Sequence, residues 1–344
     1  RPDVIVVETD PPVLGLIGLF FARLYRAKFV FYLQDLYPDV GIALGQLKNG
    51  TVVAMLKAST RRSLLGADSI VVLGEDMKKR ILDKGYRLNG RVRVIPNWAD
   101  TTQVRPWQDG QLGGQRSVEQ RMGRISIGHE KAQGAQGRNP FRQQHQLDGQ
   151  FVVMFSGNIG LSQGLDRVIE VAGALADNPT IRFVLIGEGA AKAGLVERVK
   201  REELGNVLFL PYQPKEKLSE SLSAADVHLV TLRRGLAGLI VPSKVYGIMA
   251  VGRPFIAAIE EDSHVAGIIR EHRCGIRVEP DSTEQLTAAI LWAVAHRDEL
   301  EAMGQRGREA AVTQYDRKIS VGKFRAMLEE LRPEVRSQGS EAGD

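Results

Sequence analysis

The sequence is poor in the residues that build disulfides and metal sites. Cys274 is the only cysteine among 344 residues, so the chain cannot form an internal disulfide or a cysteine-based zinc site. A lone cysteine is ordinarily a small core residue, and we expect a reducing, cytoplasmic location. The histidines, at positions 129, 145, 228, 264, 272 and 296, lack the spacing of metal ligands. The sequence therefore predicts no bound metal, and we expect no other cofactor.

Aromatic side chains and dense basic runs are also scarce. Aromatic residues make up 6% of the chain, too few for a surface that stacks single-stranded bases. Lysine and arginine outnumber aspartate and glutamate by 46 to 41, but this excess is spread along the whole chain. Such a balance favours phosphate-bearing ligands or an anionic membrane surface. It argues against nucleic acid as a partner.

No apolar run is long enough to cross a bilayer. The most apolar stretch, Val13–Leu33, is interrupted by Arg23, Arg26 and Lys28, whereas a spanning helix needs about twenty apolar residues. We therefore predict a helix followed by a strand. A helix face that rests on a membrane surface is the alternative. The chain begins at Arg1 and enters a strand-like run at once, which we interpret as the start of a fragment inside a domain.

The sequence does contain short apolar runs that alternate with helical patterns, which is typical of parallel βαβ units. The runs that predict strands are Val4–Val7, Lys28–Leu33, Ser69–Leu73, Val92–Ile95, Phe151–Asn158, Arg182–Ile186, Val207–Leu210, Val227–Thr231, Pro254–Ile259 and Gly275–Val278. Helices are expected between them, including Val13–Tyr25, Thr51–Leu65, Glu75–Lys84, Thr283–His296 and Ser320–Leu331. We predict an α/β protein in which two Rossmann-like, doubly wound parallel sheets face a cleft. Ligands would bind at the carboxyl ends of the strands.

Composition divides the chain into segments. We predict a first Rossmann-like domain over residues 1–107, lacking its first strands, and a second over residues 139–332. Residues 108–138 are rich in glycine, glutamine and arginine and have no apolar period, so we predict a disordered basic insertion at the linker. A basic interaction loop is the alternative. The polar tail, residues 333–344, is expected to be loose.

Two strand-to-helix junctions in the second half carry glycine-rich loops. The first reads SGNIGLSQG over residues 156–164, and the second reads GEG over residues 187–189. Glycines allow backbone N–H groups to approach a phosphate, and a helix N-terminus favours its charge. Each pattern also fits an ordinary βα turn.

A third junction is the most informative. It reads RRGLAGLIVPSK over residues 233–244 and opens a predicted helix. Ser243 suits the N-cap, and Lys244 falls in the first turn. Because a cation is unfavourable at a helix N-terminus, Lys244 makes sense if a phosphate occupies this position. A solvated lysine is the alternative.

Several stretches resemble the nucleotide-binding half of family 4 GT-B glycosyltransferases, in family order: SGNIGLSQGLD, LIGEGAAKAGL, NVLFLPYQPKEKLSESLSAADVHLVTL and GLIVPSKVYGIMAVGRPFIA. In the first half, ETDPPVLGL and FYLQDLYPDVGIALG resemble the same enzymes, more narrowly the WcaI/WbuB-like subgroup of colanic acid and O-antigen assembly. The resemblance implies a GT-B transferase that needs no metal. It implies a nucleotide-sugar donor, expected to be a UDP-sugar, and a lipid-linked saccharide acceptor at the inner face of the plasma membrane.

The resemblance also implies where the donor binds. The base would lie near Tyr212 and the sugar near Leu236–Ile240, in the C-terminal half, with the acceptor in the N-terminal half. The donor-binding residues implied are Gly157, Asn158, Gly160, Gln163, Tyr212, Arg233, Gly238, Leu239, Ile240, Pro242, Ser243 and Lys244.

The chain departs from the family pattern at charged positions. Where many members carry Arg-x4-Lys in the first loop, this chain has Asn158 and Gln163, which can hydrogen-bond a phosphate but cannot neutralise it. The paired glutamates of the family fall on Leu239 and Gly247, and its early histidine is replaced by Gln34. We interpret these changes as a variant site.

These departures lead to hypotheses about individual roles. We expect Lys244, with Arg233 or Arg234, to supply the cation for the leaving diphosphate, because a closed cleft must offset its negative charge. Asp35 is the candidate for acid/base work on the acceptor, and its alternative role is that of a turn residue. Glu188 is a second catalytic candidate.

Two other functions stay open. One is a non-catalytic module that binds a nucleotide sugar, which the missing family charges favour. The other is a hydrolysing UDP-N-acetylglucosamine 2-epimerase, which shares the double-Rossmann layout. That reaction needs carboxylates and histidines around the sugar, and residues 235–244 offer none.

Overall fold

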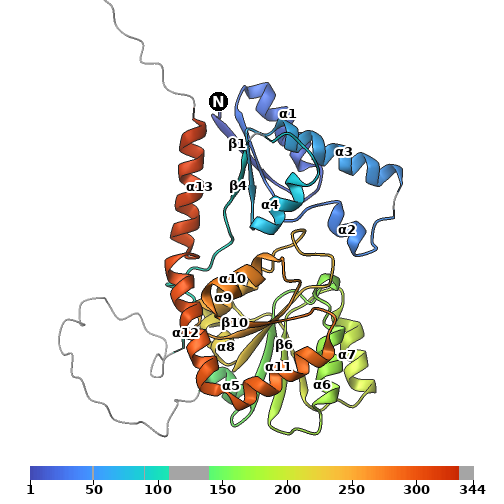
Figure 1. The fold of residues 1–344 in the computed structure, drawn as a ribbon, viewed down its shortest axis with the longest axis vertical. Helices are drawn as coiled ribbons and strands as arrows, with labels where there is room; N and C mark the ends of the chain where they lie inside the picture. Colours follow the sequence, from blue (N-terminus) through green and yellow to red (C-terminus); the bar gives the residue numbers. More distant parts are fainter. Residues whose placement is uncertain (49, 89, 108–138, 333–344) are drawn as a thin grey trace, which may run out of the picture.

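The computed structural model describes residues 1–48, 50–88, 90–107 and 139–332, which form two α/β units stacked end to end (Figure 1). The first unit has a sheet of strand order β1-β2-β3-β4, and the second has the order β10-β9-β8-β5-β6-β7. Every pair of neighbouring strands is parallel. The predicted fold class, two parallel-sheet α/β domains, is therefore confirmed.

The first unit is built on four short strands, β1 (Val4–Glu8), β2 (Lys28–Tyr32), β3 (Ser69–Val72) and β4 (Val92–Val94). Its helices are α1 (Leu14–Tyr25), α2 (Asp39–Ala43), α3 (Thr51–Gly66) and α4 (Glu75–Leu82). Strand β3 is buried along its whole length, and β2 is buried except at Lys28, as expected of central strands covered on both faces. The predicted strands of this half are confirmed to within a residue at each end.

The second unit contains the strands β5 (Phe151–Ser156), β6 (Ile181–Ile186), β7 (Val207–Leu210), β8 (Val227–Thr231), β9 (Phe255–Ala258) and β10 (Gly275–Val278). Its α-helices are α5 (Pro140–Gln144), α6 (Asp166–Ala174), α7 (Lys192–Arg201), α8 (Leu218–Ser223), α9 (Lys244–Ala250), α10 (His264–His272), α11 (Thr283–Ala295) and α12 (Arg297–Thr313). Two short 3-10 helices, η1 (Leu161–Gln163) and η2 (Lys215–Lys217), and a last helix, α13 (Arg317–Leu331), complete the chain. All six predicted strands are confirmed, whereas α5 and α12 were not predicted.

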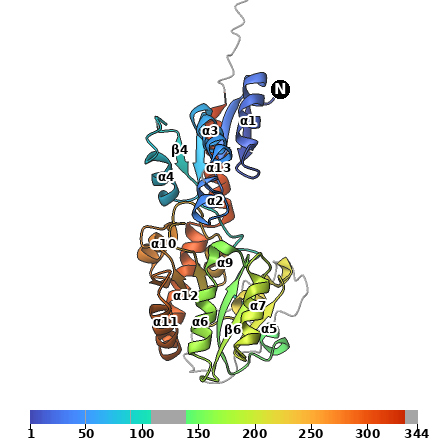
Figure 2. The ribbon, with the colours of Figure 1, turned by 90° about the vertical axis from the view of Figure 1, so that its right-hand side faces the viewer.

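Helix α13 returns to the first sheet instead of staying with the second unit (Figures 1 and 2). The Ser69 hydroxyl of β3 donates to the Met327 sulfur at 3.3 Å. Arg93 of β4 pairs with Glu330 at 2.7 Å, counted between the nearest side-chain nitrogen and oxygen. We predicted that this helix belongs to the second domain, residues 139–332, but it packs on the sheet of the first unit.

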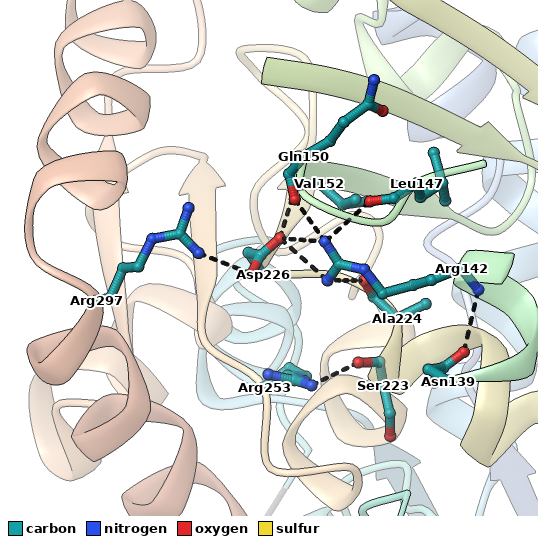
Figure 3. Close-up of polar contacts among 10 residues, drawn as sticks. All are labelled: Asn139, Arg142, Leu147, Gln150, Val152, Ser223, Ala224, Asp226, Arg253 and Arg297. Carbon is teal, nitrogen blue, oxygen red and sulfur yellow. Dashed lines mark hydrogen bonds and ion pairs between the residues drawn. The ribbon is translucent and has the colours of Figure 1, made fainter. Parts of the chain in front are cut away.

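A polar network around Arg142 anchors the beginning of the second unit (Figure 3). The Arg142 guanidinium donates to three backbone carbonyl groups and pairs with Asp226 at 3.2 Å. Arg297 approaches the same carboxylate at 3.4 Å, and the Val152 N–H donates to it at 2.7 Å. Asp226 and Val152 lie at the amino ends of β8 and β5, so this network is remote from the edge where ligands bind.

Other predictions are answered in part. Cys274 is fully buried, as predicted for a core residue. Along the stretches that the structure describes, the helices are too short or too polar to traverse a bilayer. The predicted insertion at residues 108–138 and the predicted tail at residues 333–344 lie outside the described residues.

Candidate active site in the interdomain cleft

A cavity of 790 Å³ lies between the two units. Its walls come from the segments that follow β2, β3 and β4 in the first sheet and β5, β7 and β8 in the second. Parallel α/β sheets bind ligands at this edge, because loops, glycine turns and helix starts gather beyond the carboxyl ends of the strands. The cavity therefore has the position predicted for the ligand.

The structure brings part of the predicted site together. The predicted residues that line the cavity are Asp35, Gly157, Asn158, Gln163, Ile240, Pro242, Ser243 and Lys244. The predicted residues that are not among its lining are Gly160, Glu188, Tyr212, Arg233, Gly238 and Leu239. Lining residues that the sequence did not single out include Asn97, Trp98, Asp100, Lys215, Leu218 and Leu222. Asn97 and Trp98 follow a predicted strand directly, so the same strand-end rule could have found them.

The contacts that the structure shows for the Lys244 ammonium are neutral. Its ammonium nitrogen donates to Gln163 Oε1 at 2.7 Å and lies 3.5 Å from the centre of the Phe155 ring. Within the described part of the chain it forms no ion pair with a carboxylate. Burial lowers the pKa of Lys244 well below its ordinary value. A desolvated ammonium with neutral contacts is costly, so this position is arranged to receive an anion.

The first glycine loop lies against this lysine. Gly157 has a φ of +147°, and a Cβ there would come 3.2 Å from Lys244 Cε. The loop rests in turn on the second junction: a Cβ at Gly187 would lie 1.9 Å from the Gly157 carbonyl oxygen, and one at Gly189 would lie 2.4 Å from that of Ile159. The glycines of the second junction therefore pack against the backbone of the first loop, and they do not line the cavity.

Glu188 lies outside the cavity. Its carboxylate is exposed and pairs with Lys192 at 2.7 Å, four residues further along the chain. The main-chain oxygen of Glu188 accepts a hydrogen bond from the Ile159 N–H at 2.8 Å and lies 3.5 Å from the exposed Tyr212 hydroxyl. The observed role of this residue is to hold the glycine loop through its backbone.

The two arginines of the third junction point to different places. Arg234 pairs with Glu279 at 2.9 Å and with Asp281 at 2.6 Å, and it does not line the cavity. Arg233 lines a neighbouring cavity of 310 Å³ that shares Gln163 with the larger one. Lys244 is thus the basic residue of this junction that reaches the cleft, and the part of the hypothesis that rests on Arg234 is not supported.

The rest of the third junction is docked on the first unit. The Gly238 N–H donates to Asp76 Oδ2 at 3.2 Å, and the Leu36 N–H donates to the Leu239 carbonyl oxygen at 2.9 Å. Asp35 and Ile240 form an antiparallel bridge across the boundary. Backbone contacts between the two units therefore hold this loop beside the cavity.

Asp35 faces the cleft from the first unit. Protein atoms crowd around its carboxylate, and this burial raises the pKa of Asp35, while the negative charge of Asp10 raises it further. The side chain is still open to solvent on the cleft side. A carboxyl group with a raised pKa, accessible in a cleft, is suited to proton transfer.

Ligands for a metal ion do not gather in this cleft. Among the residues that the structure describes, no three histidine, cysteine, aspartate or glutamate side chains form a cluster able to hold a metal. Of the described residues that line the cavity, Lys244 and Lys215 are the basic ones.

Comparison with known proteins gives consistent matches. The family model described as "Glycosyl transferases group 1" matches residues 137–310, and a "Glycosyl transferase 4-like domain" matches residues 1–98. The putative colanic acid biosynthesis glycosyl transferase WcaI of Escherichia coli (strain K12) is 30% identical over 301 residues, which cover 86% of this chain and 67% of WcaI. The probable glycosyltransferase WbjE of Pseudomonas aeruginosa is 27% identical over 335 residues, covering 97% and 76% of the two chains.

Solved structures agree on the fold. Anabaena Alr3699/HepE in complex with UDP-glucose superposes with a TM-score of 0.72 at 15% identity, covering 95% of this chain and 79% of that one. WaaG, a glycosyltransferase involved in lipopolysaccharide biosynthesis, gives a TM-score of 0.62 at 17% identity, covering 88% and 79%. With two parallel-sheet units around one cleft and both family matches in chain order, the chain belongs to the group 1, family 4 glycosyltransferases of GT-B fold.

Proposed function

We propose that this enzyme transfers a sugar from a UDP-sugar to a lipid-linked saccharide during the assembly of a surface polysaccharide. The observation that carries the proposal is the half-buried Lys244, whose ammonium faces the cavity beside the Gly157 loop and pairs with no carboxylate of the described residues. A departing nucleoside diphosphate brings roughly two negative charges into a site with little water, where a fixed cation stabilises it strongly.

The donor diphosphate would lie between Lys244 and the glycine loop. Lys244 exchanges its neutral contact with Gln163 for an anionic phosphate oxygen, and the amide groups of Gln163 and Asn158 contribute hydrogen bonds. The charge that the family usually places in the first loop is thus moved to the third junction. This relocation explains how the site works with Asn158 and Gln163 at the usual basic positions.

Asp35 is the proposed group on the acceptor side. The acceptor hydroxyl attacks the anomeric carbon of the donor sugar and passes its proton to the Asp35 carboxylate. The bond between that carbon and the phosphate oxygen breaks, and the electron pair leaves with the diphosphate held by Lys244. Asp35 comes from the first unit and Lys244 from the second, and both line the same cavity.

The choice of substrates rests on the relatives. The structures of Anabaena HepE contain UDP or UDP-glucose, which supports a uridine nucleotide as the donor. The name of WcaI refers to colanic acid biosynthesis, which supports a saccharide acceptor in polysaccharide assembly.

A peripheral contact with the inner face of the plasma membrane belongs to the same proposal. Helix α1 exposes Phe20 and Leu24, which are 62% and 59% exposed, beside the exposed Arg23 and Arg26. Met55 of the adjoining helix α3 is 72% exposed. Apolar side chains flanked by arginines suit the interface of an anionic bilayer, where a lipid-linked acceptor would be found.

The test begins with binding of UDP, GDP, ADP and their sugar conjugates to the purified chain. We expect UDP and a UDP-sugar to stabilise it, by about 2.7 kcal/mol at a hundredfold excess over the dissociation constant. Transfer to extracted lipid-linked saccharides is then followed with a radiolabelled donor. Stabilisation by UDP without transfer would favour a non-catalytic binding module, and conversion of UDP-N-acetylglucosamine to a free epimerised sugar would favour the epimerase. A folded chain that binds no nucleotide would contradict the proposal.

A further inference from the structure

Asp76 of the first unit holds two segments of the second unit with one carboxylate. Its Oδ2 atom accepts hydrogen bonds from the Gly238 N–H at 3.2 Å and from the His264 N–H at 2.7 Å. Its Oδ1 atom accepts the Met77 N–H of its own helix at 2.7 Å. Gly238 belongs to the loop at residues 233–243, named here the sugar-side loop, and His264 is the first residue of α10. One side chain therefore joins α4, the sugar-side loop and α10.

Arg80, one turn further along α4, contacts the same loop. Its Nε atom donates to the Ala237 carbonyl oxygen at 3.0 Å. The fit is close, since a Cβ at Gly238 would lie 2.7 Å from Arg80 Cγ and 2.8 Å from the Asp76 carbonyl oxygen. Gly238 also has a φ of +71°, which favours glycine. The backbone of the sugar-side loop is thus shaped against α4.

The contact extends to the helix that begins with Lys244. The His264 ring nitrogen Nε2 forms a hydrogen bond with the Tyr246 hydroxyl at 3.0 Å, and Tyr246 is fully buried in α9, two residues after Lys244. Asp76 therefore contacts the sugar-side loop, which precedes Lys244, directly. It is linked to α9, the helix that begins with Lys244, through His264.

The loop is held by its own unit at neighbouring N–H groups. Glu260 Oε2 accepts from the Gly235 N–H at 2.9 Å and from the Ala237 N–H at 3.2 Å. Glu260 and the loop both belong to the second unit, so these contacts do not depend on the first unit. The contacts made by Asp76 and Arg80 come from the first unit and require the two units to lie against each other. They add to the support that the loop receives from Glu260.

We propose that Asp76 and Arg80 are positioning residues that bring the sugar-side loop into its working conformation when the two units close. The inference rests on the proposed function, because it assumes that the donor sugar lies beside this loop. Asp76 and Arg80 do not line the cavity. They act through the backbone of residues 237 and 238, and so they should affect the sugar transfer more than the affinity for the nucleotide alone.

The test compares Asp76→Ala and Arg80→Met with Asp83→Asn. Asp83 lies at the end of the same helix, is exposed, and has no hydrogen bond or ion pair through its carboxylate within the described stretches. We expect kcat/KM for the UDP-sugar to fall roughly tenfold or more in Asp76→Ala, the scale of charge-assisted hydrogen bonds, and less in Arg80→Met. The dissociation constant for UDP should change less than about twofold on the same reasoning, because residues 237 and 238, through which both side chains act, do not line the cavity. Hydrogen exchange over residues 235–240 should accelerate in both variants and stay unchanged in Asp83→Asn.

Each outcome has a distinct meaning. Unchanged kcat/KM in a folded Asp76→Ala or Arg80→Met enzyme would overturn the positioning role while the transferase proposal stands. So would a parallel loss of UDP affinity, melting temperature and kcat/KM, because that pattern indicates general destabilisation. Arg80→Met protects the test against misfolding, since Arg80 is exposed, makes one side-chain hydrogen bond within the described residues, and its stem, which packs on Gly238, is kept by methionine. A wild-type chain that binds no UDP and transfers no sugar overturns the proposed function and the role of the loop together.

Discussion

The ammonium nitrogen of Lys244 lies 2.7 Å from the side-chain oxygen of Gln163, a neutral acceptor; the Gln163 side chain is buried and that of Lys244 is half-buried. An amide oxygen satisfies one donor of the ammonium but leaves its charge uncompensated. The folded protein without ligand therefore contains an electrostatic penalty that an anion removes on binding.

Replacing this cation should increase stability and abolish function. In Lys244→Met we expect the free energy of unfolding to rise by about 1 kcal/mol at neutral pH, because a side chain of similar length replaces a desolvated charge. Donor affinity and turnover should be lost. Denaturant melts with and without UDP measure both effects. Gln163→Met serves as the control that removes the hydrogen bond and keeps the charge. A Lys244→Met protein that is less stable than wild type would show that the charge of Lys244 does not destabilise the folded protein.

Binding of UDP should take up protons. Burial lowers the pKa of Lys244 in the free protein, and a bound diphosphate favours the charged form and raises this pKa again. Affinity for UDP should therefore fall as the pH rises through the pKa of the free protein. The linkage with folding has the opposite slope: stability rises with pH between the folded and unfolded pKa values, because the unfolded chain binds more protons in that window. Calorimetry in two buffers of different ionisation enthalpy counts the protons, and Lys244→Met should show no uptake.

On the acid side of the pH–rate profile, the decline of kcat/KM should reflect the protonation of the Asp35 carboxylate. If its carboxylate accepts the acceptor proton, kcat/KM declines as the pH falls through a pKa that lies above the usual aspartate range. Asp35→Asn should lower kcat by about 10²-fold or more and remove this limb. Asp10→Asn removes the like charge that raises the Asp35 pKa, so it should shift the limb to lower pH at nearly full activity. A limb that stays in place in Asp10→Asn would assign it to another group.

Gly187→Ala should displace the glycine loop at residues 156–164, because the added methyl group would clash with the backbone of that loop. Its φ of +143° and the distance of 1.9 Å between an added Cβ and the Gly157 carbonyl oxygen leave no room for a methyl group. We expect a loss of about 2 kcal/mol or more in unfolding free energy, together with weaker UDP binding. The matched control is Gly194→Ala in α7, where a Cβ meets no atom within 4 Å and should stabilise the helix by about 1 kcal/mol. Equal stabilities of the two variants would contradict the described packing.

The strands and the position of the site could be predicted because their signals are local. Buried runs such as Val227–Thr231 are apolar along the chain, and Lys244 stands out because a cation at a helix start needs a reason. The directions of Arg233 and Arg234 could not be predicted, since adjacent residues of an irregular loop follow no period. The pairing of Glu188 with Lys192 could not be predicted either, because Glu188 lies in the loop before α7, where the helical i,i+4 rule does not apply.

Contacts between segments that lie far apart in the chain could not be predicted from local sequence patterns. Nothing in the local pattern of α4 indicates that Asp76 accepts N–H groups from residues 162 and 188 positions away. Its position in the first turn suggested only an ordinary acidic helix start. The same reason explains why the pattern of the last helix did not predict the sheet on which it packs.

The packing of α13 separates the order of synthesis from the order of folding. Ser69 and its partner Met327 are 258 positions apart. At roughly 5–20 residues per second, a ribosome needs about 13 to 52 s to deliver the second after the first. During that interval, while the second unit is being made, the first sheet lacks the contacts that α13 makes with β3 and β4. Of the two described units, the first therefore cannot complete this packing until the second has been synthesised.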